Sequence, residues 1–275
     1  PLKETPPPLD WTPFLRLVGM TAFFTLVILG VGQVVKWIST LLVDISSAAL
    51  LFGIMGLLGL VGMLVAVAMG VYFSVRVGVG EDAKKNPSFT WWVINRLFFL
   101  VGTTNLSGFA IYYFQGRLGY VEEKAAGPAA QLMMLVGIFI LLSALPSGWL
   151  ADRFGHKRMV VLSGLIAALG TTITILTTSL SVIYVGGCLI GIATGFFFTS
   201  NWALGTRLVP KAEAGRYLGI SNLAGAGAGA VGGYIGGPIA DFFTVQFPHI
   251  PGLGYVLLFT LYGVMFLLSV VALIG

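Results

Sequence analysis

The sequence predicts an all-α protein that crosses a membrane several times. Of its 275 residues, 57% are hydrophobic and only 9% are charged, and the mean hydropathy is +0.97. A soluble domain of this size does not bury so much apolar surface, whereas a transmembrane helix needs about 20 mostly apolar residues. Eight stretches meet this requirement and are the predicted spans: 13–37, 48–75, 91–116, 129–149, 159–179, 181–206, 214–243 and 253–274.

The basic residues are distributed unequally between the two sides of these spans. With the N-terminus in the cytoplasm, eleven of the 15 Lys and Arg residues lie at cytoplasmic ends and loops. Three lie on the other side (Lys36, Arg117 and Lys124), and Arg96 lies just inside a span. This asymmetry follows the positive-inside rule and predicts an even number of spans with both termini cytoplasmic. The net charge of +5 is thereby explained by topology, and we expect no nucleic-acid partner.

Four segments follow from the spans and the composition between them. Residues 1–12 are Pro-rich and are predicted to be a cytoplasmic linker. Residues 13–75 contain two transmembrane helices, and 76–90 form a charged cytoplasmic loop. Residues 91–275 contain six spans with tight connections, which predicts a six-helix transmembrane bundle.

The most specific motif is the charged stretch 148–158, which reads GWLADRFGHKR and joins two apolar spans. A carboxylate at Asp152 could cap the N-terminus of a neighbouring helix, where unpaired N–H groups and the helix dipole favour negative charge. We expect Gly148 to permit close approach of that helix, and Gly155 to permit the turn.

This stretch resembles the G-x-L-x-D-R-x-G-x-K/R-x loop signature of the major facilitator superfamily. Residues 201–223 are similar to a second cytoplasmic loop of that family, particularly in bacterial sugar and sucrose transporters. The resemblance covers residues 91–275 and implies the C-terminal six-helix half of such a protein, located in the bacterial inner membrane. Residues 13–75 are then either the last two helices of an N-terminal half or two helices inserted between halves; the Pro-rich opening slightly favours insertion.

In this family the loop acts as a conformational latch. The resemblance assigns that role to residues that match its signature: Gly148, Asp152, Arg153, Gly155, Lys157 and Arg158. The alternative is a basic loop that only sets the topology.

Polar residues inside spans face a bundle interior or a wet cavity, because exposing them to lipid is costly. The predicted solute-binding residues carry amide, hydroxyl or phenol groups, which suit a neutral hydroxylated ligand: Asn105, Tyr112, Gln115, Ser221 and Asn222. Asn105 and Tyr112 are about two turns apart and should share a helix face. Asn201 and Trp202 are weaker candidates near the loop. The alternative is hydrogen bonding between helices, with tyrosines at the membrane interface.

Two further features have simple structural explanations. We expect Arg96 to extend its charged end to the cytoplasmic surface, although it could instead pair with Asp152 or with a substrate anion. The Gly-rich run 225–238 has no Lys-Ser/Thr and follows no strand, so it is no phosphate-binding loop. Its glycines at Gly225, Gly229, Gly233 and Gly237 predict close helix packing.

The expected function is secondary transport of a small polar solute, with a sugar or related polyol implied by the resemblance. The expected partners are the lipid bilayer, the solute, and a missing N-terminal half or other membrane subunits. The alternative function is a structural or assembly subunit of a larger membrane complex, without transport of its own. The sequence contains no metal-ligand cluster, nucleophile–base pair or dinucleotide fingerprint, so we expect neither an enzyme nor a cofactor.

Overall fold

The computed structural model describes residues 11–80 and 86–274, and this part of the chain is helical without strands. The all-α membrane fold is therefore confirmed. Short connections join its helices, whose bounds are α1 (Thr12–Leu41), α2 (Ala48–Val79), α3 (Pro87–Gly108), α4 (Ala110–Leu118), α5 (Glu122–Phe154), α6 (His156–Ile175), α7 (Leu180–Leu208), the 3-10 turn η2 (Lys211–Glu213), α8 (Ala214–Gln246) and α9 (Leu253–Ile274).

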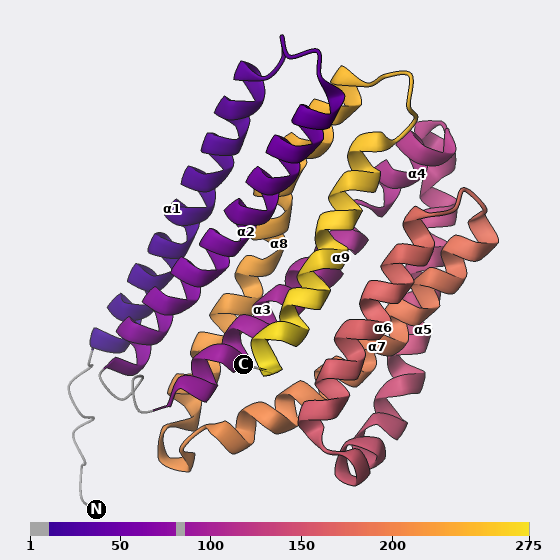
Figure 1. Ribbon diagram of the computed structural model, residues 1–275. Coiled ribbons are helices and arrows are strands. Elements are labelled where there is room, and N and C mark those ends of the chain that lie inside the picture. Colours follow the sequence, from indigo (N-terminus) through magenta and orange to yellow (C-terminus); the bar gives the residue numbers. More distant parts are fainter. Residues whose placement is uncertain (1–10, 81–85, 275) are drawn as a thin grey trace, which may run out of the picture.

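The helices form one bundle, with the first two at one side (Figure 1). α1 and α2 form an antiparallel hairpin that packs on α8. α3 lies between α8 and α9, and α9 also contacts α6. α5 and α6 pack on α7 at the other side of the bundle. α1 begins and α9 ends at the same end of the bundle, as an even number of crossings requires (Figure 1).

Six helices of the described chain are long and apolar enough to cross a membrane, or seven if the bent pair α3–α4 is one span. Six of the eight predicted spans coincide with these helices. The predicted span 214–243 lies within the 33-residue α8, which is not among these helices; glycine and polar residues fill much of its length. The predicted linker falls mostly outside the described residues, and α1 begins at Thr12.

The predicted span 91–116 is not one straight helix. α3 ends at Gly108, and α4 begins at Ala110 with its axis bent by 57°. Phe109 lies at the break, with φ −96° and ψ 4°. The expectation that Asn105 and Tyr112 share a helix face was wrong, because the bend separates them onto two helices with different axes.

Glycines set the spacing at two helix interfaces. On α7, Gly191 and Gly195 face α5 so closely that an added Cβ would lie 2.6 Å from the carbonyl oxygens of Val136 and Ile140, respectively. These two glycines and Gly187 are spaced four residues apart, the small-residue pattern that lets membrane helices touch. This spacing is a pattern in the sequence itself.

The Gly-rich run of α8 makes the second such interface. An added Cβ at Gly225, Gly229 or Gly233 would lie 3.1–3.5 Å from a side chain of α3, so the predicted close packing is present there. Gly237 has no heavy atom within 4 Å of such a Cβ and does not take part. The run therefore allows a close approach of α8 to α3 over about two helical turns.

The topology can be tested at the two ends of α5. Lys124 and Lys157 are exposed, at the start of α5 and the start of α6. In a background where Cys188 is replaced by alanine, we expect an impermeant thiol reagent outside the cell to label Lys124→Cys and not Lys157→Cys. As the control, permeabilising the membrane should make Lys157→Cys reactive. Labelling of both positions from outside in intact cells would contradict the topology.

Candidate functional site

A chain of buried amide groups joins three helices in the interior of the bundle. Asn201 of α7 is fully buried, and its Oδ1 accepts a hydrogen bond of 3.1 Å from the Arg96 guanidinium of α3. The Asn201 amide nitrogen donates to Asn95 Oδ1 at 3.0 Å. Asn95 in turn donates to the carbonyl oxygen of Ser269 on α9 at 2.7 Å. α3, α7 and α9 are therefore linked by one continuous network.

Arg96 is buried rather than extended to the membrane surface. Only 6% of the residue is exposed, and it lies about 14 Å along α3 from the first residue of the helix. Its guanidinium also lies 4.8 Å from the ring centroid of Trp202, in cation–π contact. The expectation that Arg96 reaches the surface was wrong, because Asn201 and Trp202 supply partners inside the bundle. It forms no ion pair with Asp152 either, nor with any other acid in the described residues.

The beginning of α3 is fixed by its sequence and by α7. Pro87 occupies the first turn, and the side chain of Asn86 caps the helix by accepting from the Phe89 amide at 3.3 Å. The Asn86 amide also donates to the Leu208 carbonyl at the end of α7, at 2.8 Å. One turn further along, the Trp92 indole donates to the Asn201 carbonyl at 3.1 Å. These bonds set the register of α3 against α7 and bring Arg96 to Asn201.

Two of the five predicted solute-binding residues lie in the interior. Asn105 is 4% exposed and donates to the carbonyls of Val101 and Ala228, at 2.9 and 3.1 Å. Ser221 of α8 is fully buried, and its hydroxyl has no hydrogen-bond partner in the described chain. Asn105 reaches α8 at Ala228, and Ser221 lies seven residues earlier on α8, about 10 Å along the helix.

The other three predicted residues lie elsewhere. Tyr112 of α4 is 51% exposed, and its ring is 6.2 Å from that of Tyr255. Gln115 is half-buried on α4, and Asn222 is exposed on α8. The structure therefore does not bring the five residues together, and a binding role for these three stays a prediction.

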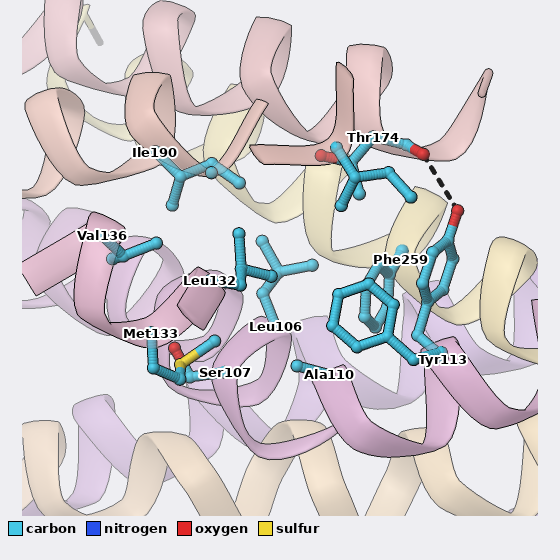
Figure 2. Close-up of a pocket in the computed structure, with 13 residues that line it drawn as sticks. Leu106, Ser107, Ala110, Tyr113, Leu132, Met133, Val136, Thr174, Ile190 and Phe259 are labelled. Atoms are coloured by element: carbon cyan, nitrogen blue, oxygen red, sulfur yellow. Dashed lines mark hydrogen bonds between the residues drawn. The ribbon is translucent and has the colours of Figure 1, made fainter. Parts of the chain in front are cut away.

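A small cavity lies at the bend between α3 and α4 (Figure 2). Its volume is about 30 Å³, and its walls are almost entirely apolar. The Tyr113 hydroxyl beside it donates to the Thr174 carbonyl at 2.9 Å (Figure 2). Sites for small organic ligands span roughly 300–1,000 Å³, whereas this volume holds about one or two waters. The cavity is therefore too small to bind a sugar.

The loop between α5 and α6 is a single residue. Gly155 has φ +95°, in the region that favours glycine, so its predicted role in the turn is confirmed. Asp152 does not cap α6; its carboxylate lies 3.8 Å from the His156 imidazole, one turn along the chain. An added Cβ at Gly148 would meet nothing within 4 Å, so the close helix approach expected there is not present among the described residues.

The basic side chains of the same loop point away from the core. Arg153 lies over the rings of Trp149 and Phe154, at 5.6 Å from each centroid, and Lys157 and Arg158 are exposed. The loop thus presents three cations and one carboxylate at one end of the bundle. A latch function for these residues stays a prediction.

Comparison with known proteins gives a family match and several distant relatives. Residues 92–275 match the model of the Major Facilitator Superfamily. The minor myo-inositol transporter IolF of Bacillus subtilis is 32% identical over 90 residues, which cover 33% of this chain and 20% of that protein. Myo-inositol transporter 2 of Schizosaccharomyces pombe is 28% identical over 146 residues, covering 51% of this chain and 26% of the relative.

A human protein is also similar, namely solute carrier family 2, facilitated glucose transporter member 12. It is 25% identical over 121 residues, covering 43% of this chain and 20% of that protein. The chain thus spans about a quarter or less of the length of these curated relatives. No solved structure matches it.

Proposed function

The chain belongs to the Major Facilitator Superfamily, and from that premise we propose that it acts in secondary transport of a small hydroxylated solute, of the sugar or inositol class. The observation that carries this proposal is the set of amide and hydroxyl side chains held in an otherwise apolar interior. Such groups are costly to place among membrane helices and typically mark a solute pathway or interhelix contacts. The three relatives named above are transporters of myo-inositol or glucose, which supports the solute class.

We place the solute at the α3–α8 interface, near Asn105 and Ser221. The two hydrogen bonds that Asn105 makes within the described residues use its amide nitrogen, which leaves its carbonyl oxygen as an acceptor. The Ser221 hydroxyl is buried without a hydrogen-bond partner among the described residues, and it can both donate and accept. The hydroxyl groups of a sugar or inositol both donate and accept hydrogen bonds, so they need an acceptor such as the Asn105 oxygen and a group such as the Ser221 hydroxyl. Tyr112, Gln115 and Asn222 stay predictions, because they lie outside this interface.

Transport would proceed by alternating access, in which packed helix groups move against one another around the solute. We propose that residues 91–275 move as one six-span unit. The unit lies in the cytoplasmic membrane, with the α5–α6 loop on the cytoplasmic side. Within this unit, the glycines of α8 lie against the Leu100, Thr104 and Asn105 side chains of α3, so the α8 backbone comes close to that helix. No observation on the described residues favours the alternative, a structural subunit without transport.

The solute site can be tested at Ser221. Ser221→Ala removes a hydroxyl that has no partner in the described part of the chain, so the fold should keep its stability while the solute loses one hydrogen bond. The apparent affinity should fall about two- to twelve-fold, the equivalent of roughly 0.5–1.5 kcal/mol. The measurement is uptake of labelled myo-inositol and glucose by cells that lack their own carriers and express the full-length gene.

Ser163→Ala is the matched control for this test. Ser163 is also fully buried, but its hydroxyl bonds to the Val160 carbonyl of its own helix α6. Its substitution should leave uptake unchanged. An unaltered affinity of Ser221→Ala for every solute that the parent carries would show that the site is elsewhere.

The latch can be tested separately at Asp152. Asp152→Asn keeps the shape of the side chain and removes the charge that faces His156. We expect normal abundance in the membrane with a changed rate of uptake, because the balance between the two access states shifts. Asp44→Asn, in the exposed loop between α1 and α2, is the control and should behave like the parent. If Asp152→Asn takes up solute at the same rate as the parent, the loop has a topological role only.

A further inference from the structure

A pocket of about 570 Å³ lies where the start of α1, the end of α2 and the start of α8 meet. These three ends lie at the same end of the bundle (Figure 1). The pocket is lined by two arginines, three apolar side chains and three glycines: Arg16, Leu17, Met20, Gly78, Gly215, Arg216, Gly219 and Ile220. None of these lining residues belongs to the amide network or to the proposed solute site, although Ile220 directly precedes Ser221 on α8.

The lining is polar at the rim and apolar further in. Arg16 is the fifth residue of α1, and Arg216 is the third residue of α8. Met20 and Ile220 follow one turn later on the same two helices, about 6 Å deeper into the bundle, and both are buried. The pocket is thus charged at one end and apolar at the other, in the same order as the head group and acyl chains of a lipid in a bilayer.

The rim carries a net positive charge. Arg216 donates to the Gly78 carbonyl and to the Glu213 carboxylate, the latter at 3.0 Å. Its orientation across the gap between α2 and α8 is therefore fixed. Arg16 is exposed and forms no hydrogen bond or ion pair with any residue of the described chain. One of the two positive charges thus has no counterion within the described residues.

We propose that this pocket binds an anionic phospholipid. Its phosphate contacts Arg16 and Arg216, and one acyl chain lies against Leu17, Met20 and Ile220. Arginine pairs well with phosphate, and basic pockets between membrane helices bind anionic head groups. A soluble anion would use the rim alone and would leave the apolar part exposed. α1 and α5 are the least buried of the candidate spans in the described chain, so the other described helices leave much of the α1 surface uncovered beside the pocket.

Glycines keep the space open for the chain of the lipid. An added Cβ at Gly215 or Gly219 would have no heavy atom within 4 Å. A leucine at position 219 can therefore fill the pocket without displacing the backbone. Gly237 lies on the same helix, outside the pocket, and has equally open surroundings. It provides a matched control.

The test is lipid retention measured by native mass spectrometry. The full chain is purified in detergent and mixed with equal amounts of phosphatidylglycerol and phosphatidylcholine. We expect the parent to retain phosphatidylglycerol preferentially. Arg16→Gln should weaken that retention about five-fold, as expected for one cation near a membrane surface. Gly219→Leu should reduce retention of both lipids, because it removes the space for the chain.

Two control variants and one competitor complete the test. Arg207→Gln, exposed at the end of α7, and Gly237→Leu should behave like the parent. If Gly219→Leu does not fold, Arg16→Gln alone decides, because the Arg16 side chain has no hydrogen bond or ion pair to lose within residues 11–80 and 86–274. Parental retention by Arg16→Gln would overturn the proposal. Displacement of the lipid by millimolar inorganic phosphate would also overturn it and would identify a site for a free anion.

Discussion

The burial of the Arg96 charge is the constraint on which the rest of the bundle depends. A guanidinium inside a membrane protein is stable only with partners, and here these are the Asn201 amide and the Trp202 ring. Asn201 must then be held by Asn95, and Asn95 by the α9 backbone. Each residue in this network is positioned by the next hydrogen bond. Burying the Arg96 side chain therefore constrains the positions of α3, α7 and α9.

Small residues supply the second part of this stability. Apolar burial gives little net attraction between helices in lipid, so contact relies on close packing and on hydrogen bonds. The glycines of α7 and α8 bring backbones and short side chains together at the α5 and α3 interfaces. The amide network fixes α3, α7 and α9, while the glycine faces permit movement beside it. A carrier that changes its access state needs both properties in one bundle.

Much of the fold could be predicted from the sequence, since apolar length and basic asymmetry act over whole spans. The turn at Gly155 and the packing of the Gly-rich run were also visible as local patterns. The break at Phe109 was missed although Ser107 and Gly108 directly precede it, and Gly/Ser pairs are a common cause of sharp helix kinks. The interior position of Arg96 was missed because its partners, Asn201 and Trp202, lie more than 100 residues away in the sequence. The proposed solute site retains only Asn105 and Ser221 of the five predicted residues, because the bend places Tyr112 and Gln115 on α4 and Asn222 is exposed.

The central claim is that Arg96 and Asn201 stabilise the bundle as a pair. A double-mutant cycle with Arg96→Met, Asn201→Leu and the combined variant, unfolded in detergent, measures their coupling directly. Each single change leaves a buried polar group without its partner, whereas the double change removes both groups. We predict that the double variant is more stable than the sum of the single effects implies, with a coupling energy of about 1–2 kcal/mol. A coupling energy below about 0.5 kcal/mol, typical of independent sites, would contradict the account.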